Sequence, residues 1–175
     1  MKLAYADPPY LGKCGKHYDH RHDPPWGCWD QLTTHQQLVN YLVAEFPDGW
    51  ALSLSHPSAR HIWPMTPPDT RMAPWVKTLC VYKKGVRPAY AWEPILYRGG
   101  RNDHPPTPAK GGAAITPKDW VSAPVEFRKG LVGAKPPPVC RAILDWLGYL
   151  PGDELVDVFP GTGVMSHVRA QGVLT

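Results

Sequence analysis

Residues 154–170 constrain the fold of this chain more than any other stretch. Residues 154–159 (ELVDVF) have the apolar content of a buried strand, residues 160–163 (PGTG) follow directly, and residues 164–170 then have the composition of a helix. A strand, a glycine turn and a helix in this order let the backbone approach a nucleotide-like ligand closely and direct helix N–H groups toward it. The segment therefore predicts an α/β fold with a ligand at the carboxyl end of this strand.

A second informative stretch lies near the other end of the chain. Residues 3–6 (LAYA) predict a short strand, which is followed by Asp7, Pro8, Pro9 and Tyr10. The Asp carboxylate and the Pro8 carbonyl can accept hydrogen bonds from the exocyclic amino group of a planar base, and the Tyr ring can stack on it. The prolines make the turn rigid because their φ is fixed. An Asp-Pro-Pro turn is also ordinary loop chemistry, so this stretch alone leaves both interpretations open.

Together the two stretches resemble one known family. Residues 7–10 look like the catalytic DPPY motif of the S-adenosylmethionine-dependent amino-methyltransferases of nucleic acids, and residues 157–163 (DVFPGTG) are similar to their DPFxGxGT cofactor loop. Residues 133–138 (GAKPPP) resemble the Lys-Pro segment that precedes the cofactor strand. The resemblance implies a catalytic motif made of Asp7, Pro8, Pro9 and Tyr10. It implies a cofactor site made of Lys135, Pro136, Asp157, Phe159, Pro160, Gly161, Thr162 and Gly163.

The order of the motifs narrows the resemblance further. The catalytic motif comes first and the cofactor loop last, as in the circularly permuted subgroup of these enzymes. This resemblance implies a single Rossmann-like α/β domain over residues 1–175 with a mostly parallel sheet. It implies S-adenosyl-L-methionine as the cofactor and the amino group of adenine in DNA as the target, in a small enzyme of the kind that suits a phage or other mobile element.

Other substrates and roles stay open at this point. Asp7, where the cytosine-modifying branch carries Ser, favours adenine, and it also favours a base over a protein glutamine. The alternatives are an RNA adenine or a cytosine amino-methyltransferase, and a catalytically weak nucleic-acid-binding remnant of a methyltransferase.

Length and composition agree with one enzyme domain. A chain of 175 residues, 43% of them hydrophobic, can bury a core without disulfides, and its four cysteines have no framework spacing. The net charge of +4 is compatible with a polyanionic partner. No run of 18 or more apolar residues indicates a membrane span, and the first residues do not resemble a signal peptide. We therefore expect a cytoplasmic protein that binds nucleic acid and no membrane.

Local patterns predict further elements. Strands are expected at 50–55, 75–82 and 92–97, and helices at 33–46, 58–63 and 137–147. Pro94 favours an edge position or the start of its strand, because proline cannot donate to a sheet. Residues 99–124 are rich in Gly and Pro and predict a long loop. The alternation of strands and helices predicts an α/β sandwich, in which both motifs lie at the carboxyl ends of strands.

Residues 11–31 predict a lid-like loop over the substrate. The family carries a polar substrate-covering loop directly after its catalytic motif, and the resemblance places phosphate and base contacts in it. The candidate contacts are Lys13, Lys16, His17, Tyr18 and Arg21. The same segment holds potential zinc ligands, namely Cys14, His17, His20, His22 and Cys28. Their spacing fits no standard zinc motif, so we expect no metal.

Three more residues complete the candidate site. Residues 92–98 resemble a family segment that places Glu93 toward the pocket, and Arg98 and Arg101 in the following loop can contact the target strand. A solvated surface loop explains these arginines equally well. Family members also continue into a strand whose acidic end holds the cofactor ribose, whereas only residues 172–175 are left here. Either another residue holds the ribose, or cofactor affinity is weak, or the chain needs a partner, which could be a second copy of itself.

Overall fold

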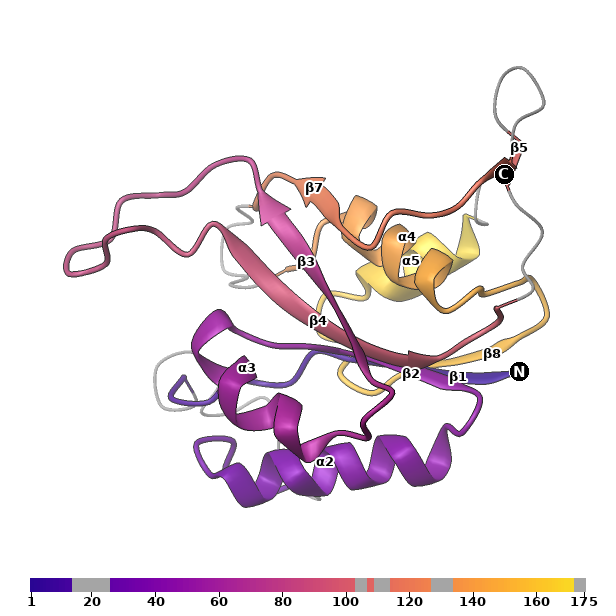
Figure 1. Cartoon of the computed structure of the whole chain (residues 1–175), viewed down its shortest axis with the longest axis horizontal. Helices are drawn as coiled ribbons and strands as arrows, with labels where there is room; N and C mark the ends of the chain where they lie inside the picture. Colours follow the sequence, from indigo (N-terminus) through magenta and orange to yellow (C-terminus); the bar gives the residue numbers. More distant parts are fainter. Residues whose placement is uncertain (14–25, 103–106, 109–113, 127–133, 172–175) are drawn as a thin grey trace.

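A six-stranded mixed sheet forms the centre of the fold (Figure 1). The structure is a computed structural model that describes residues 1–13, 26–102, 107–108, 114–126 and 134–171. The sheet order is β7-β3-β4-β2-β1-β8, and only β4 runs against the other strands. The predicted α/β class with a mostly parallel sheet is therefore confirmed. The strands are β1 (Lys2–Ala6), β2 (Gly49–Ser53), β3 (Arg71–Lys77), β4 (Trp92–Gly99), β7 (Val121–Ala123) and β8 (Glu154–Asp157).

Helices cover both faces of the sheet (Figure 1). Helices α2 (Leu32–Glu45) and α3 (His56–Ile62), followed by the 3-10 turn η1 (Trp63–Met65), lie on one face, and α4 (Pro137–Trp146) and α5 (Val164–Ala170) lie on the other. Side chains alternate between the faces of a strand, so each strand contributes to two cores. In β1, Leu3 and Tyr5 join the core under α4 and α5, whereas Ala4 and Ala6 join the core under α2.

Two predicted boundaries were wrong, and long-range pairing explains both. The strand expected at 75–82 is β3, which ends at Lys77, and residues 78–91 form a loop that joins it to β4. The loop expected at 99–124 contains β7, which pairs in parallel with β3. It also contains the short hairpin of β5 (Thr107–Pro108) and β6 (Ala114–Ile115). The Trp75 indole donates to the carbonyl of Ala123 in β7 at 3.1 Å, a contact that no local pattern reveals.

Pro94 was expected on an edge strand or near the start of its strand, and only the edge position was wrong. Strand β4 lies inside the sheet between β3 and β2, and Pro94 is its third residue. Pro94 lies directly opposite Pro74 of β3. The two residues that lack an N–H thus face each other, which confines the loss of hydrogen-bond donors to one position of the ladder.

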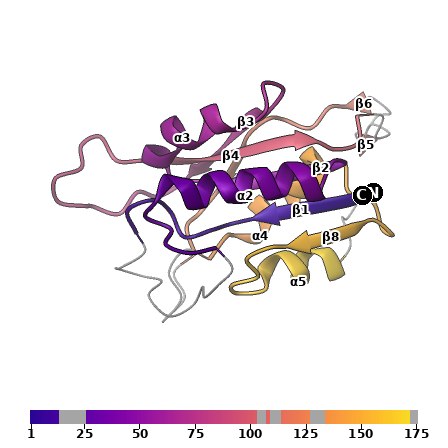
Figure 2. The same cartoon turned by 90° about the horizontal axis from the view of Figure 1, so that it is seen from below.

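Strands β1 and β8 bring the two sequence motifs together. They are adjacent and parallel, as the second view shows (Figure 2). In their register, Tyr5 lies opposite Asp157. Residues 7–10 and 158–163 therefore leave the sheet at the same edge, the position where open α/β sheets bind ligands.

Within the described ranges, no helix combines the length and the apolar character needed to cross a membrane.

Candidate active site

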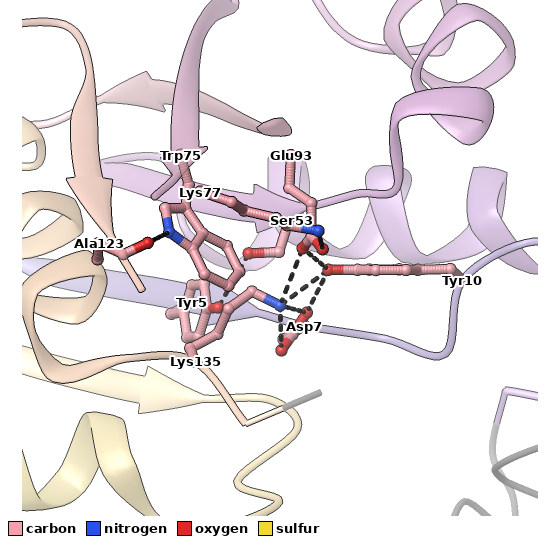
Figure 3. Close-up of polar contacts among 9 residues, drawn as sticks. All are labelled: Tyr5, Asp7, Tyr10, Ser53, Trp75, Lys77, Glu93, Ala123 and Lys135. Atoms are coloured by element: carbon pink, nitrogen blue, oxygen red, sulfur yellow. Dashed lines mark hydrogen bonds and ion pairs between the residues drawn. The ribbon is translucent and has the colours of Figure 1, made fainter. Parts of the chain in front are cut away.

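Two carboxylates and two ammonium groups meet at the carboxyl edge of the sheet (Figure 3). Asp7 follows β1, Lys77 ends β3, Glu93 is the second residue of β4, and Lys135 precedes α4. Because β4 runs antiparallel to its neighbours, it begins at the edge where β1 and β3 end. The topology thus gathers four charged side chains that lie far apart in the sequence. We call them the charge cluster.

Lys135 lies at the centre of the charge cluster (Figure 3). Its Nζ is 2.8 Å from each carboxylate oxygen of Asp7, 2.8 Å from the Tyr10 hydroxyl and 3.8 Å from Glu93 Oε2. The Tyr10 hydroxyl donates to Glu93 Oε2 at 3.0 Å and lies 3.3 Å from Asp7 Oδ1. Lys77 Nζ binds the other Glu93 oxygen at 2.6 Å. The Lys135 ammonium group and the Tyr10 hydroxyl therefore hold the Asp7 carboxylate in a defined position.

Burial makes these charges interdependent. The Lys135 side chain is only 6% exposed and that of Asp7 20%. Burial raises the pKa of Asp7 above its usual value, although the Lys135 ammonium opposes this shift. Burial also acts to raise the pKa of Glu93, but Lys135 and Lys77 outweigh it and leave that pKa lowered. Two carboxylates can share this small space because two ammonium groups balance them.

Aromatic rings frame the charge cluster. Lys135 Nζ lies 5.3 Å from the ring centroid of Tyr10 and 5.9 Å from that of Trp75, and Lys77 Nζ lies 5.5 Å from the same Trp75 ring. Cations this close to a ring face are attracted by its electrons. Burial raises the pKa of Tyr10 well above its ordinary value, so its hydroxyl stays a hydrogen-bond donor.

The glycine turn after β8 (residues 160–163) leaves open space next to Gly163. Gly163 is the N-cap of α5 with φ of +72°, a conformation that only glycine adopts without strain, and a Cβ there would meet nothing within 4 Å. The Gly163 N–H donates to the Pro160 carbonyl at 2.6 Å, which closes the turn. The Val158 N–H donates to the Tyr5 carbonyl at 2.9 Å and ties the turn to β1. Phe159 is buried, with its ring 5.2 Å from that of Trp29.

Asp157 is one of the residues that line a cavity next to β8 and α2. The cavity has a volume of about 650 Å³ and is lined by Trp26, Gln37, Tyr41, Val156, Asp157 and Val158. Asp157 Oδ1 is buried and has no hydrogen-bond partner among the residues that the structure describes. Burial, aided by the negative charge of Asp7, raises the pKa of Asp157 to about 6. A buried acceptor without a partner fits a ligand that brings a hydroxyl or ammonium donor.

Comparison with solved structures identifies the fold. Crystal structures of the DNA methyltransferase M1.HpyAVI superpose on the chain with a TM-score of 0.61 for its SAM complex and 0.57 for the second structure. Both matches cover 98% of this chain at 14% identity, and 78% and 76% of the M1.HpyAVI chain. The chain has a methyltransferase fold. No protein-family model matches the sequence, and no curated protein is significantly similar to it.

The methyltransferase fold brings most of the predicted site residues to one edge. Asp7, Tyr10 and Glu93 lie together as expected, and Pro8 and Pro9 are buried beside them. Lys135, expected at the cofactor, contacts Asp7, and Pro136 is the N-cap of α4. The Lys13 N–H donates to the Tyr10 carbonyl at 2.9 Å and closes a turn after the motif.

Other predicted residues lie elsewhere. Arg98 and Arg101 are at the opposite edge of the sheet, where they bind Asp69 at 2.8 Å and Asp153 at 2.9 Å. Lys16, His17, Tyr18 and Arg21 lie outside the described residues, as do most of the potential zinc ligands (Cys14, His17, His20 and His22). Among the residues that are described, no group of three or more His, Cys, Asp or Glu side chains could hold a metal.

Sequence reasoning missed Lys77. The predicted strand at 75–82 placed this residue in its middle, whereas the true strand ends there and directs Lys77 to Glu93. A usable signal was the spacing of Trp75 and Lys77, because residues two apart share one face of a strand. A cation that follows a buried aromatic residue on that face indicates a buried site at the end of the strand.

Proposed function

We propose that this protein transfers a methyl group from S-adenosyl-L-methionine to the exocyclic amino group of adenine in DNA. One observation carries the proposal: the Asp7 loop and the glycine turn leave the same sheet edge from adjacent parallel strands, with Tyr5 opposite Asp157. The fold shared with M1.HpyAVI, which was crystallised with SAM, supports the cofactor and the DNA substrate. The catalytic motif precedes the cofactor loop in the chain, which supports membership of the permuted subgroup.

The turn after β8 is the proposed cofactor site. When bound, S-adenosylmethionine supplies an electrophilic methyl group on a positively charged sulfur. Asp157 has a buried Oδ1 that can accept a hydrogen bond from the ligand, and the turn at 160–163 leaves open space above Gly163. The cavity beside Asp157 has a volume typical of small-molecule sites. Phe159 keeps the turn in place by its contact with Trp29.

The charge cluster is the proposed site for the target base. A base in duplex DNA leaves its stack to reach such a pocket, at a cost of a few kcal/mol that contacts in the pocket offset. Asp7 and the Pro8 carbonyl accept the amino hydrogens, which leaves the nitrogen lone pair available for attack, and the Tyr10 ring stacks on the base. The base replaces part of the hydrogen bonding between Lys135 and Asp7, while Tyr10 and Glu93 still hold the ammonium group. Alignment of the two bound reactants supplies much of the remaining rate.

Mass spectrometry of the product tests this proposal directly. Purified protein is incubated with S-adenosylmethionine and duplex DNA, and the nucleosides from the digested DNA are analysed. We expect N6-methyladenine with the wild-type protein and none with Asp7→Ala. N4-methylcytosine would overturn the assignment to adenine, and methylation of RNA alone would overturn DNA. Cofactor binding without transfer to any nucleic acid would favour the non-catalytic remnant.

A further inference from the structure

Among the residues that the structure describes, the loop between β3 and β4 carries the most exposed large non-polar side chains, and the proposed reaction does not use it. Residues 78–91 extend away from the sheet beyond the ends of both strands (Figure 1). Tyr82 is 87% exposed, and Leu79, Val81 and Tyr90 are between 49% and 62% exposed. Exposure of several large apolar side chains on one short segment is unfavourable in water and marks a surface that binds a partner.

The charge of the loop indicates what that partner is. Residues 78–91 contain Lys83, Lys84 and Arg87 and no acidic residue. None of the three cations forms an ion pair with any residue that the structure describes. The Lys83 carbonyl accepts from the Val86 N–H at 3.2 Å, and Gly85 has φ of +76°, so a tight turn presents Lys83 and Lys84 at the end of the loop. Unpaired cations beside exposed aromatic and aliphatic groups fit phosphates and bases together.

The base of the loop is fixed to the charge cluster. Lys77 directly precedes the loop and Glu93 follows it by one residue, and these two side chains bind each other at 2.6 Å. The Lys77 N–H also donates to the Ala91 carbonyl at 2.8 Å. On α3, His56 packs against Tyr90 and Trp92, at centroid distances of 5.2 Å and 4.6 Å. Both ends of the loop are therefore anchored next to the charge cluster, and the loop projects from that edge of the sheet.

We propose that residues 78–91 form a DNA-binding loop that enters the duplex beside the target base. Lys83, Lys84 and Arg87 contact backbone phosphates, and Tyr82 stacks on bases next to the position that the flipped adenine leaves. Apolar and aromatic side chains are inserted between base steps in this way by proteins that distort DNA. This inference rests on the proposed function, because it requires a nucleic-acid substrate at the same edge of the sheet.

The salt dependence of DNA binding tests the proposed contacts between the loop cations and backbone phosphates. The affinity for a short duplex is measured by fluorescence anisotropy over a range of salt concentrations, without cofactor. Lys83→Ala with Lys84→Ala is expected to reduce the slope of log K against log salt by up to about 1.8, because each lost phosphate contact removes about 0.9. The matched control is Lys2→Ala with Arg71→Ala, which removes two positive charges at the opposite sheet edge and should leave the slope unchanged. An equal slope in the loop variant and the wild type would overturn the inference.

Substitution of Tyr82 tests the stacking contact. Tyr82→Ala is expected to reduce methyl transfer to duplex DNA about tenfold, with a smaller effect on single-stranded DNA, in which the base is already unpaired. Tyr82→Phe should retain activity, because it keeps the ring. Equal losses on both substrates would overturn the role in opening the duplex. If the wild-type protein binds no DNA at all, the proposed function fails; if it binds DNA and both loop variants match it, only the loop inference fails, and the exposed surface then serves a protein partner.

Discussion

Lys135 donates to both carboxylate oxygens of Asp7 at 2.8 Å, across 128 residues of sequence. The contact joins the segment before α4 to the end of β1 and fixes the orientation of the carboxylate that we assign to the target base. The buried ammonium also opposes the rise in the pKa of Asp7 that burial causes. The cation is thus a positioning group for Asp7 in addition to any contact with the cofactor.

The first prediction concerns Asp7 itself. Asp7→Ala is expected to abolish methyl transfer and to leave cofactor affinity nearly unchanged, because the carboxylate contacts the base and not the turn after β8. Calorimetry with S-adenosylmethionine and a transfer assay measure the two effects separately. Asp69→Ala, which removes an exposed carboxylate at the opposite edge, is the control. If Asp7→Ala keeps more than about a tenth of the rate, a barrier change below about 1.4 kcal/mol, the role assigned to Asp7 is wrong.

The second prediction concerns the positioning role of Lys135. Lys135→Met keeps the length of the side chain but leaves two carboxylates with one ammonium group, so the pKa of Asp7 is expected to rise further. Because Asp7 acts as a carboxylate, the acidic limb of the pH–rate profile should move to higher pH, with partial recovery of activity in alkaline buffer. We also expect a loss of about 3–5 kcal/mol of unfolding free energy, because removal of one partner leaves a buried charge uncompensated.

A matched variant distinguishes this effect from general destabilisation. Lys77→Met removes the other ammonium group, which contacts Glu93 and not Asp7. It should lower stability with a smaller shift of the acidic limb. Equal pH–rate profiles for Lys135→Met and the wild type would show that Lys135 does not control the ionisation of Asp7.

The third prediction concerns the glycine turn. Gly163→Val is expected to weaken cofactor binding, since the side chain enters the open space above the turn and the φ of +72° strains any residue with a Cβ. Gly152→Val is the control, because Gly152 has φ of +103°, equally open surroundings and a position before β8 at the opposite edge. Each variant should lose about 1–2 kcal/mol of stability from backbone strain. Only Gly163→Val should raise the Kd for S-adenosylmethionine; unchanged affinity in a folded Gly163→Val protein would exclude the turn as the cofactor site.

The fourth prediction concerns the pH dependence of cofactor binding. A hydrogen bond from the cofactor requires Asp157 as a carboxylate, and its pKa in the free protein is about 6. Affinity for S-adenosylmethionine should therefore be constant above about pH 6 and fall by up to tenfold per pH unit below it. Titration calorimetry from pH 5 to 8 measures this. Asp157→Asn should bind weakly with no such dependence, and a wild-type affinity that is flat across this range would contradict the contact.

The same group affects the stability of the protein without cofactor. The folded-state pKa of Asp157 lies above its ordinary value of 3.8, so burial favours the neutral acid. Its contribution to stability is therefore present below about pH 4 and is lost as the pH rises through about 6. Thermal unfolding of Asp157→Asn should show a higher Tm than the wild type at pH 7 and little difference at pH 4. The reverse order would mean that the hydrogen bond from the Phe159 backbone, which lowers this pKa, outweighs the effect of burial.

The sequence alone determined the local elements that carry the two motifs. The strand, glycine turn and helix at 154–170 became β8, the turn and α5, and the run before Asp7 became β1. These elements were predictable because their signals are local: apolar content, a glycine conformation and helical composition. The α/β class followed from the alternation of such segments.

Only the tertiary structure decided which side chains meet. The strand order places Tyr5 opposite Asp157, and the antiparallel course of β4 returns Glu93 to the edge where Lys77 ends β3. The same course carries Arg98 to the other edge, away from the charge cluster. Strand order and direction depend on packing between segments distant in sequence, which no local pattern encodes. The sequence therefore contained the residues of the site, and the burial of one sheet between two helical layers set their partners.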